Sequence, residues 1–148
     1  MFKNILVSTD GSNLSAKTVR MSVQVAKTMG GAVTGVYVIA PYTPAVYGEG
    51  MMYAPQASPR RYKEISEREA RKALAAVEVE AGAAGVASKS VMLTAANPWE
   101  GIIRTAKAKN SDLIVMASHG RRGLAGLVLG SETTKVLTHS KVPVLVCR

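Results

Sequence analysis

Short apolar runs rich in β-branched residues recur along the chain and alternate with longer segments that mix apolar and charged positions. The apolar runs are Ile5–Val7, Val33–Ile39, Ser90–Leu93, Leu113–Ala117 and Val142–Val146. Continuous apolar runs of this length are typical of parallel strands that are buried on both faces of a sheet. The pattern therefore predicts five strands, each joined to the next by a crossover segment.

The segments between these runs have the spacing of helices. We expect them over about residues 14–29, from about 62 to 84, from just after Asn97, and from about 131 to 138. In the first, Leu14, Thr18, Met21 and Val25 form one stripe and neighbouring valines widen it, so most of that helix should be covered. In the third, the Asn97 side chain is expected to cap the helix, with Pro98 as its first residue.

The order of elements is β-α-β-α-β-α-β-α-β, with right-handed crossovers. Helices that alternate with buried strands cover both faces of the sheet. The chain is therefore predicted to be a single α/β domain over residues 1–148, with an open, Rossmann-like sheet of five parallel strands and helices on both faces.

The stretch from Ala40 to Pro59 breaks the pattern. It contains four prolines and three tyrosines and shows no clean period. A loop of about 20 residues is unusual in a compact domain and often forms a lid or a binding loop. We expect this one to be mobile without ligand and to serve as a lid or a partner surface. A surface excursion without a role is the alternative.

Composition and charge narrow the function classes. The 148 residues are 47% hydrophobic and carry a net charge of +9. No apolar run reaches the roughly 18 residues of a membrane span, and the N-terminus lacks a signal-peptide cleavage site, so we expect a cytoplasmic protein with no membrane partner. Seven aromatic residues are too few to interleave with the basic ones as a stacking platform, which disfavours nucleic acid as the main partner. The lone Cys147 and two distant histidines predict no disulfide and no metal site.

Two polar segments follow strand ends, where open α/β sheets bind their ligands. The first is Ser8–Ser12, and the second is Ala117–Gly120 together with Gly130-Ser131. Neither contains the GxGxxG pattern of dinucleotide sites or the GxxxxGK[ST] loop, which disfavours those two classes. In the second segment the glycines let backbone amides approach a ligand, and Ser131 begins a helix, whose N-terminus favours anions. The alternative is that these glycines and serines form a turn and a helix cap and bind no ligand.

Individual polar residues have competing interpretations. Asp10 is placed to contact a ligand or to stabilise the turn before the first helix. No carboxylate or second histidine is visible to orient His119, so a turn or phosphate contact is favoured over a general base. Arg121 and Arg122 either close on phosphates or face solvent. Cys147 is favoured as a structural thiol, and no catalytic residue is predicted.

The chain resembles the universal stress protein family over essentially its whole length. The resemblance rests on the N-terminal Ile-Leu-Val-Ser-Thr-Asp-Gly-Ser, Tyr37–Ile39, Ser111–Met116, Ser118–Gly120, Gly130-Ser131 and Val142–Val146. Nucleotide-binding members have G-x2-G-x9-G-[ST] after the fourth strand. Gly120, Gly130 and Ser131 match the last three elements, whereas Ala117 stands at the first glycine and adds a methyl group there.

The resemblance implies that Asp10 and the backbone of Val38 hold the adenosine end of ATP. Amides around Gly120, Gly130 and Ser131, with Thr133, would hold its phosphates. Whether Mg²⁺ accompanies the nucleotide is left open. The binding residues expected on this basis are Thr9, Asp10, Val38, Ala117, His119, Gly120, Arg121, Gly130, Ser131, Glu132 and Thr133.

The resemblance also implies a homodimer. The final strand, Val144–Val146, is an apolar sheet edge that must be covered, and in the family it pairs with its copy. The expected function is that of a dimeric, ATP-binding stress regulator or sensor with at most slow ATP hydrolysis. The alternative is a dimeric interaction module that does not bind nucleotide, in which Ala117 in place of the first motif glycine indicates the lost site. Neither the stress signal nor the protein partner is indicated by the sequence.

Overall fold

The computed structural model describes residues 1–43, 58–120 and 129–148. Its strands are β1 (Asn4–Ser8), β2 (Ala32–Ile39), β3 (Ser88–Thr94), β4 (Leu113–Ala117) and β5 (Val144–Cys147). Its helices are α1 (Asn13–Met29), α2 (Pro59–Ala83), α3 (Pro98–Ala108) and α4 (Ser131–His139). All strand pairs are parallel, and the sheet has the order β3-β2-β1-β4-β5. The predicted fold class is confirmed.

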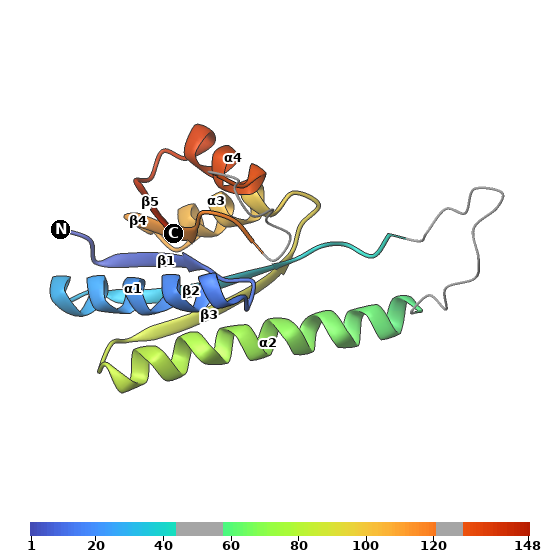
Figure 1. Cartoon of the computed structure of the whole chain (residues 1–148), viewed down its shortest axis with the longest axis horizontal. Coiled ribbons are helices and arrows are strands. Elements are labelled where there is room, and N and C mark those ends of the chain that lie inside the picture. Colours follow the sequence, from blue (N-terminus) through green and yellow to red (C-terminus); the bar gives the residue numbers. More distant parts are fainter. Residues whose placement is uncertain (44–57, 121–128) are drawn as a thin grey trace.

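Helices cover both faces of the sheet: α1 and α2 lie on one side, and α3 and α4 lie on the other (Figure 1). Successive strand residues point to opposite faces, which sorts the core into two layers. Ile5 and Val7 of β1 pack under α1 and α2, whereas Leu6 packs with Ile102 of α3 and Val136 of α4. The central strands are therefore buried on both faces, as their continuous apolar runs indicate.

The buried face of α1 differs from the predicted one. Nine of the 17 residues of α1 are exposed, Met21 among them at 48%, so the expectation that most of this helix is covered was wrong. Buried positions include Thr18 and Ser22 beside Val19 and Val23. The Thr18 and Ser22 hydroxyls donate to carbonyl oxygens four residues earlier in the same helix, at 2.9 and 2.8 Å. Because each hydroxyl is satisfied within the helix, burying it costs little.

The cap of α3 also differs. The helix begins at Pro98 as predicted, but the Asn97 side chain makes no cap bond and instead donates to Glu100 Oε1 at 3.0 Å. The Trp99 N–H donates to Glu132 Oε2 of α4 at 2.9 Å. A free backbone donor in the first turn is therefore satisfied by a carboxylate 33 residues away in the sequence.

Hydrogen bonds in two turns place the starts of α2 and β5 at other residues than predicted. The Ser58 hydroxyl caps α2 by accepting the Arg61 N–H at 3.2 Å, so the helix begins inside the stretch expected to be a loop. Ser140 accepts the Val142 N–H at 3.0 Å in a tight turn, so β5 begins at Val144 rather than at Val142. Most of the predicted lid, residues 44–57, lies outside the described residues, and its role is untested.

Candidate functional site

A cavity of about 230 Å³ opens at the carboxyl ends of β1 and β4. From β1 the chain crosses through α1 to β2, and from β4 it crosses through α4 to β5 on the other side. The crossovers therefore diverge between these two strands, where open α/β sheets bind ligands. The cavity is lined by Ser8, Thr9, Asp10, Ser15, Val38, Pro98, Ile102, Met116, Ala117, His119, Gly120, Glu132 and Thr133.

The turn after β1 is held by its own side chains. Thr9 Oγ1 lies 2.7 Å from Ser15 Oγ and accepts the Gly11 N–H at 3.2 Å. Asp10 Oδ1 accepts the Ser12 N–H at 2.9 Å, and Ser12 in turn caps α1. Asp10 thus stabilises the turn, as one of the two interpretations predicted, and it also lines the cavity.

The turn after β4 brings backbone very close to backbone. Gly130 N–H donates to Ser118 O at 2.7 Å, and Ser118 N–H donates to Cys147 O of β5 at 2.7 Å. A Cβ on Gly130 would lie 3.3 Å from both His119 Cα and Ser118 O. A Cβ on Gly120 would lie 3.0 Å from Asp10 Oδ2. Both glycines therefore let other parts of the protein pack closely against them. That their amides also approach a ligand stays a prediction.

α4 begins at this end of the sheet, and the N–H groups in the first turn of a helix have no partner within the helix. The helix begins at Ser131, with Gly130 as an N-cap that supplies no side-chain bond. The Thr133 hydroxyl donates to Ala117 O at 3.0 Å and Ser118 O at 3.2 Å, which ties the first turn to the end of β4. Unsatisfied N–H groups at a fixed helix N-terminus favour an anion.

Val38 offers backbone groups on the opposite wall. The backbone N–H and C=O groups of successive residues point to opposite sides of a parallel strand. Val36 O accepts the Thr9 N–H from the β1 side, whereas Ile39 O accepts the Ala95 N–H from the β3 side. Val38 is two residues after Val36, so its N–H and C=O point toward β1, beyond the last β1–β2 pair at Ser8 and Val36. These groups therefore face the side on which the cavity lies.

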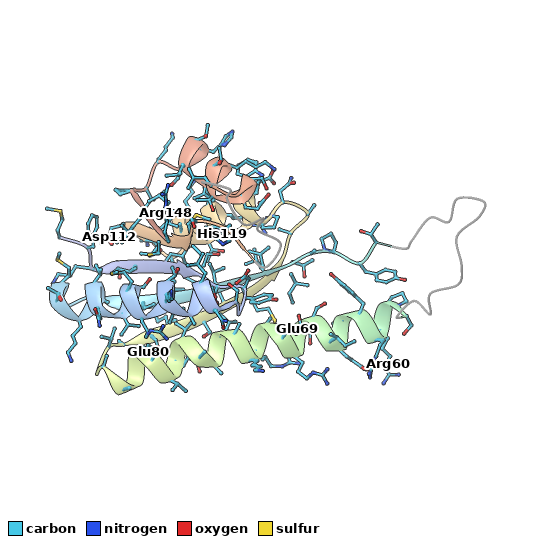
Figure 2. The ribbon with its side chains drawn as sticks, viewed as in Figure 1. Arg60, Glu69, Glu80, Asp112, His119 and Arg148 are labelled. Atoms are coloured by element: carbon cyan, nitrogen blue, oxygen red, sulfur yellow. The ribbon has the colours of Figure 1, made fainter. Side chains whose placement is uncertain are left out.

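Most of the predicted binding residues gather at this cavity. His119, labelled in Figure 2, lies at the end of β4, with Nδ1 3.1 Å from Ser118 Oγ. Ser131 is exposed, and Gly130 packs against the His119 backbone. Neither residue lines the cavity. Arg121 and Arg122 lie outside the described residues. The sequence reasoning missed Ser15, Pro98 and Ile102, which are helix residues without a motif of their own.

A second, larger hollow of about 440 Å³ lies between α1 and α2. Val19 and Ala73 are among its apolar lining residues, and Glu69 and Glu80 line it along α2 (Figure 2). Thr9 and Ser15 line both hollows, so their hydroxyl pair is part of a shared wall.

Three further findings concern the thiol, metal ligands and the helices. Burial raises the pKa of the Cys147 thiol, and a hydrogen bond with Thr18 opposes that shift in part. In residues 1–43, 58–120 and 129–148, no three His, Cys, Asp or Glu side chains gather as a metal site. No helix within the same ranges is long and apolar enough to cross a bilayer.

The universal stress protein family model matches residues 1–148. The chain belongs to this family. A universal stress protein of Methanocaldococcus jannaschii is 31% identical over 150 residues, which span all of this chain and 83% of the relative. The universal stress protein YxiE of Bacillus subtilis is 30% identical over 149 residues, the full length of both proteins. The predicted family resemblance is thus confirmed.

Solved structures show the same fold for this universal stress protein. UspA from Lactobacillus plantarum matches with a TM-score of 0.78 at 24% identity, covering 99% of this chain and 98% of that one. The Archaeoglobus fulgidus protein in complex with dAMP matches with a TM-score of 0.73 at 18% identity, covering 99% and 98%. A universal stress protein in complex with cAMP matches with a TM-score of 0.68 at 22% identity, covering 98% and 95%. Because these identities are below 25%, the similarity to the solved structures shows the shared fold alone.

Proposed function

We propose that this universal stress protein binds an adenine nucleotide, ATP, in the cavity between β1 and β4. The observation that carries the proposal is the N-terminus of α4, whose N-cap Gly130 supplies no side-chain bond and which Thr133 fixes at the edge of a cavity at the switch point of the sheet. The adenosine end lies against Val38 and Asp10. The phosphates lie against the amides of the first turn of α4 and the backbone around Gly120.

The groups that line the cavity suit this ligand. Val38 and Ile102 supply apolar wall for a purine ring, and the backbone of Val38 supplies a donor and an acceptor for its polar edge. A carboxylate such as that of Asp10 is a suitable acceptor for ribose hydroxyls. Relatives with the same fold bind dAMP and cAMP, which supports an adenine nucleotide as the ligand class.

We further propose that the protein acts as a homodimer that pairs through β5. In the described sheet β5 is an edge strand, and its Leu145 is 38% exposed. An apolar edge strand is a template for pairing with another chain, and a twofold dimer covers both copies at once.

We assign the protein a regulatory or sensory role in the cytoplasm rather than that of a rapid enzyme. Phosphoryl transfer needs a positioned nucleophile or base. His119 contacts the neighbouring Ser118 hydroxyl, and Asp10 is engaged in its turn. These residues therefore support binding better than turnover.

Mass spectrometry of ligand released from the purified protein, followed by calorimetric titration with ATP, tests this function. The titration is run with and without Mg²⁺, since the cation can accompany the phosphates. Co-purified adenine nucleotide or saturable binding of one ATP per chain is the expected result. No ligand and no binding at millimolar ATP would instead favour an interaction module in which the Ala117 methyl group marks a lost site.

A further inference from the structure

The N-terminal ends of two helices meet at one carboxylate. Glu132 is the second residue of α4, and its Oε2 accepts the N–H of Trp99, the second residue of α3, at 2.9 Å. Its side chain therefore lies where the positive ends of both helix dipoles are close. Free amides and helix dipoles of this kind are what attract a phosphate. The protein thus holds an anion of its own at this position.

The same residue belongs to the wall of the cavity. Glu132 lines it, together with Pro98 from the start of α3 and Thr133 from the start of α4. Lys135 Nζ lies 3.4 Å from Glu132 Oε1, but the two side chains are 45% and 36% exposed. Solvent screens an ion pair of this kind, so Lys135 offsets only part of the negative charge felt inside the cavity.

We propose that Glu132 sets how much phosphate charge the cavity accepts. The inference rests on the proposed nucleotide function. The carboxylate stabilises the helix ends without ligand and repels each negative charge that a bound nucleotide brings near them. Adenosine carries no phosphate and is unaffected, AMP is penalised, and ATP is penalised most. Glu132 is thereby a specificity-determining residue: ATP still binds, but the carboxylate lowers its affinity relative to that of adenosine.

Replacing Glu132 by glutamine isolates this effect. The amide oxygen of glutamine still accepts the Trp99 N–H, so α3 keeps its cap while the charge is lost. Glu100→Gln is the matched control: Glu100 is also an acid in the first turn of α3, it is exposed, and it bonds to Asn97 rather than lining the cavity. Because Trp99 is the single tryptophan of the chain, its fluorescence reports whether the local structure of each variant is intact.

Calorimetric titration of wild type and both variants with adenosine, AMP and ATP provides the test. With Glu132→Gln we expect unchanged adenosine affinity, tighter AMP binding, and ATP affinity raised by about fivefold or more, the scale of the repulsion between two unit charges about 4 Å apart in water. Glu100→Gln should leave all three affinities within about twofold, because solvent screens the charge of an exposed residue that does not line the cavity.

The outcomes separate the two proposals. If the ligands bind and Glu132→Gln leaves the ratio of ATP to adenosine affinity unchanged, the role of Glu132 is wrong while the nucleotide site stands. An equal rise with Glu100→Gln would also overturn it, because net charge alone would then explain the effect. If neither adenosine nor ATP binds wild type or variant, the proposed function itself fails and this inference fails with it.

Discussion

Replacing Gly130 by valine should weaken ATP binding while the protein stays folded. Gly130 has φ −72° and ψ 158°, a conformation that valine adopts without strain. The obstacle is space, because a Cβ there would lie 3.3 Å from His119 Cα and from Ser118 O. Both contacts are with backbone atoms, so the start of α4 must move away from the end of β4.

The size of the effect follows from these contacts. Overpacking of this kind costs about 1 to 3 kcal/mol, and removing a glycine from the unfolded chain returns about 0.4 to 1 kcal/mol. A net loss of at most about 2.6 kcal/mol leaves a typical domain folded. Each amide displaced from a bound phosphate loses a charge-assisted hydrogen bond of about 1.5 to 3 kcal/mol, so affinity should fall at least about tenfold.

Calorimetry with ATP and urea denaturation measure the two effects separately. Gly82→Ala is the matched control, because Gly82 lies in the last turn of α2 and a Cβ there meets nothing within 4 Å. That variant should gain up to about 1 kcal/mol of stability from helix propensity and bind ATP normally. If Gly130→Val binds ATP as wild type does, α4 does not hold the phosphates at its start.

Other predictions concern assembly, packing and the thiol. Leu145→Lys should shift the dimer toward monomer in light scattering at micromolar concentration, since a charge would be buried in an interface on the order of 1,000 Å² or more; an unmodified protein that is already monomeric contradicts the β5 dimer. Thr133→Val should cost about 0.5 to 1.5 kcal/mol in urea denaturation because Ala117 O and Ser118 O lose the Thr133 hydroxyl, while Ser118 O keeps the Gly130 N–H. Loss of the exposed Thr138 hydroxyl should cost less than about 0.5 kcal/mol. Because burial raises the pKa of Cys147, its alkylation at pH 8 should be slower in the folded than in the unfolded protein. Because folding favours the neutral thiol, Cys147 stabilises the folded protein at neutral pH relative to high pH, and this stabilisation is lost as pH rises above about 8.5. Equal alkylation rates in the folded and unfolded protein would contradict the raised pKa.

The sheet could be predicted from the sequence because its central strands are buried on both faces. Ile5–Val7 and Leu113–Ala117 are continuous apolar runs for that reason. Hydropathy alone could not predict which face of α1 is buried. Met21 scores as core yet is exposed, while Ser22 scores as polar yet is buried with its hydroxyl bonded inside the helix.

The candidate site was predictable where it depends on strand ends. Asp10 and Gly120 lie in the turns that follow β1 and β4, and parallel strands bring their carboxyl ends to one edge. Pro98 and Ile102 were missed, because a residue on a helix gives no local sign of the cavity that it faces. The bond from Trp99 to Glu132 was missed because it joins two helices that are distant in sequence.

A crystal structure of the protein in complex with ATP tests the nucleotide site most directly. The cavity between β1 and β4 should hold the adenosine against Val38, and the phosphates should lie within hydrogen-bond distance of the amides in the first turn of α4. Nucleotide density elsewhere on the protein, or phosphates that point away from Ser131–Thr133, would contradict the assignment of this cavity.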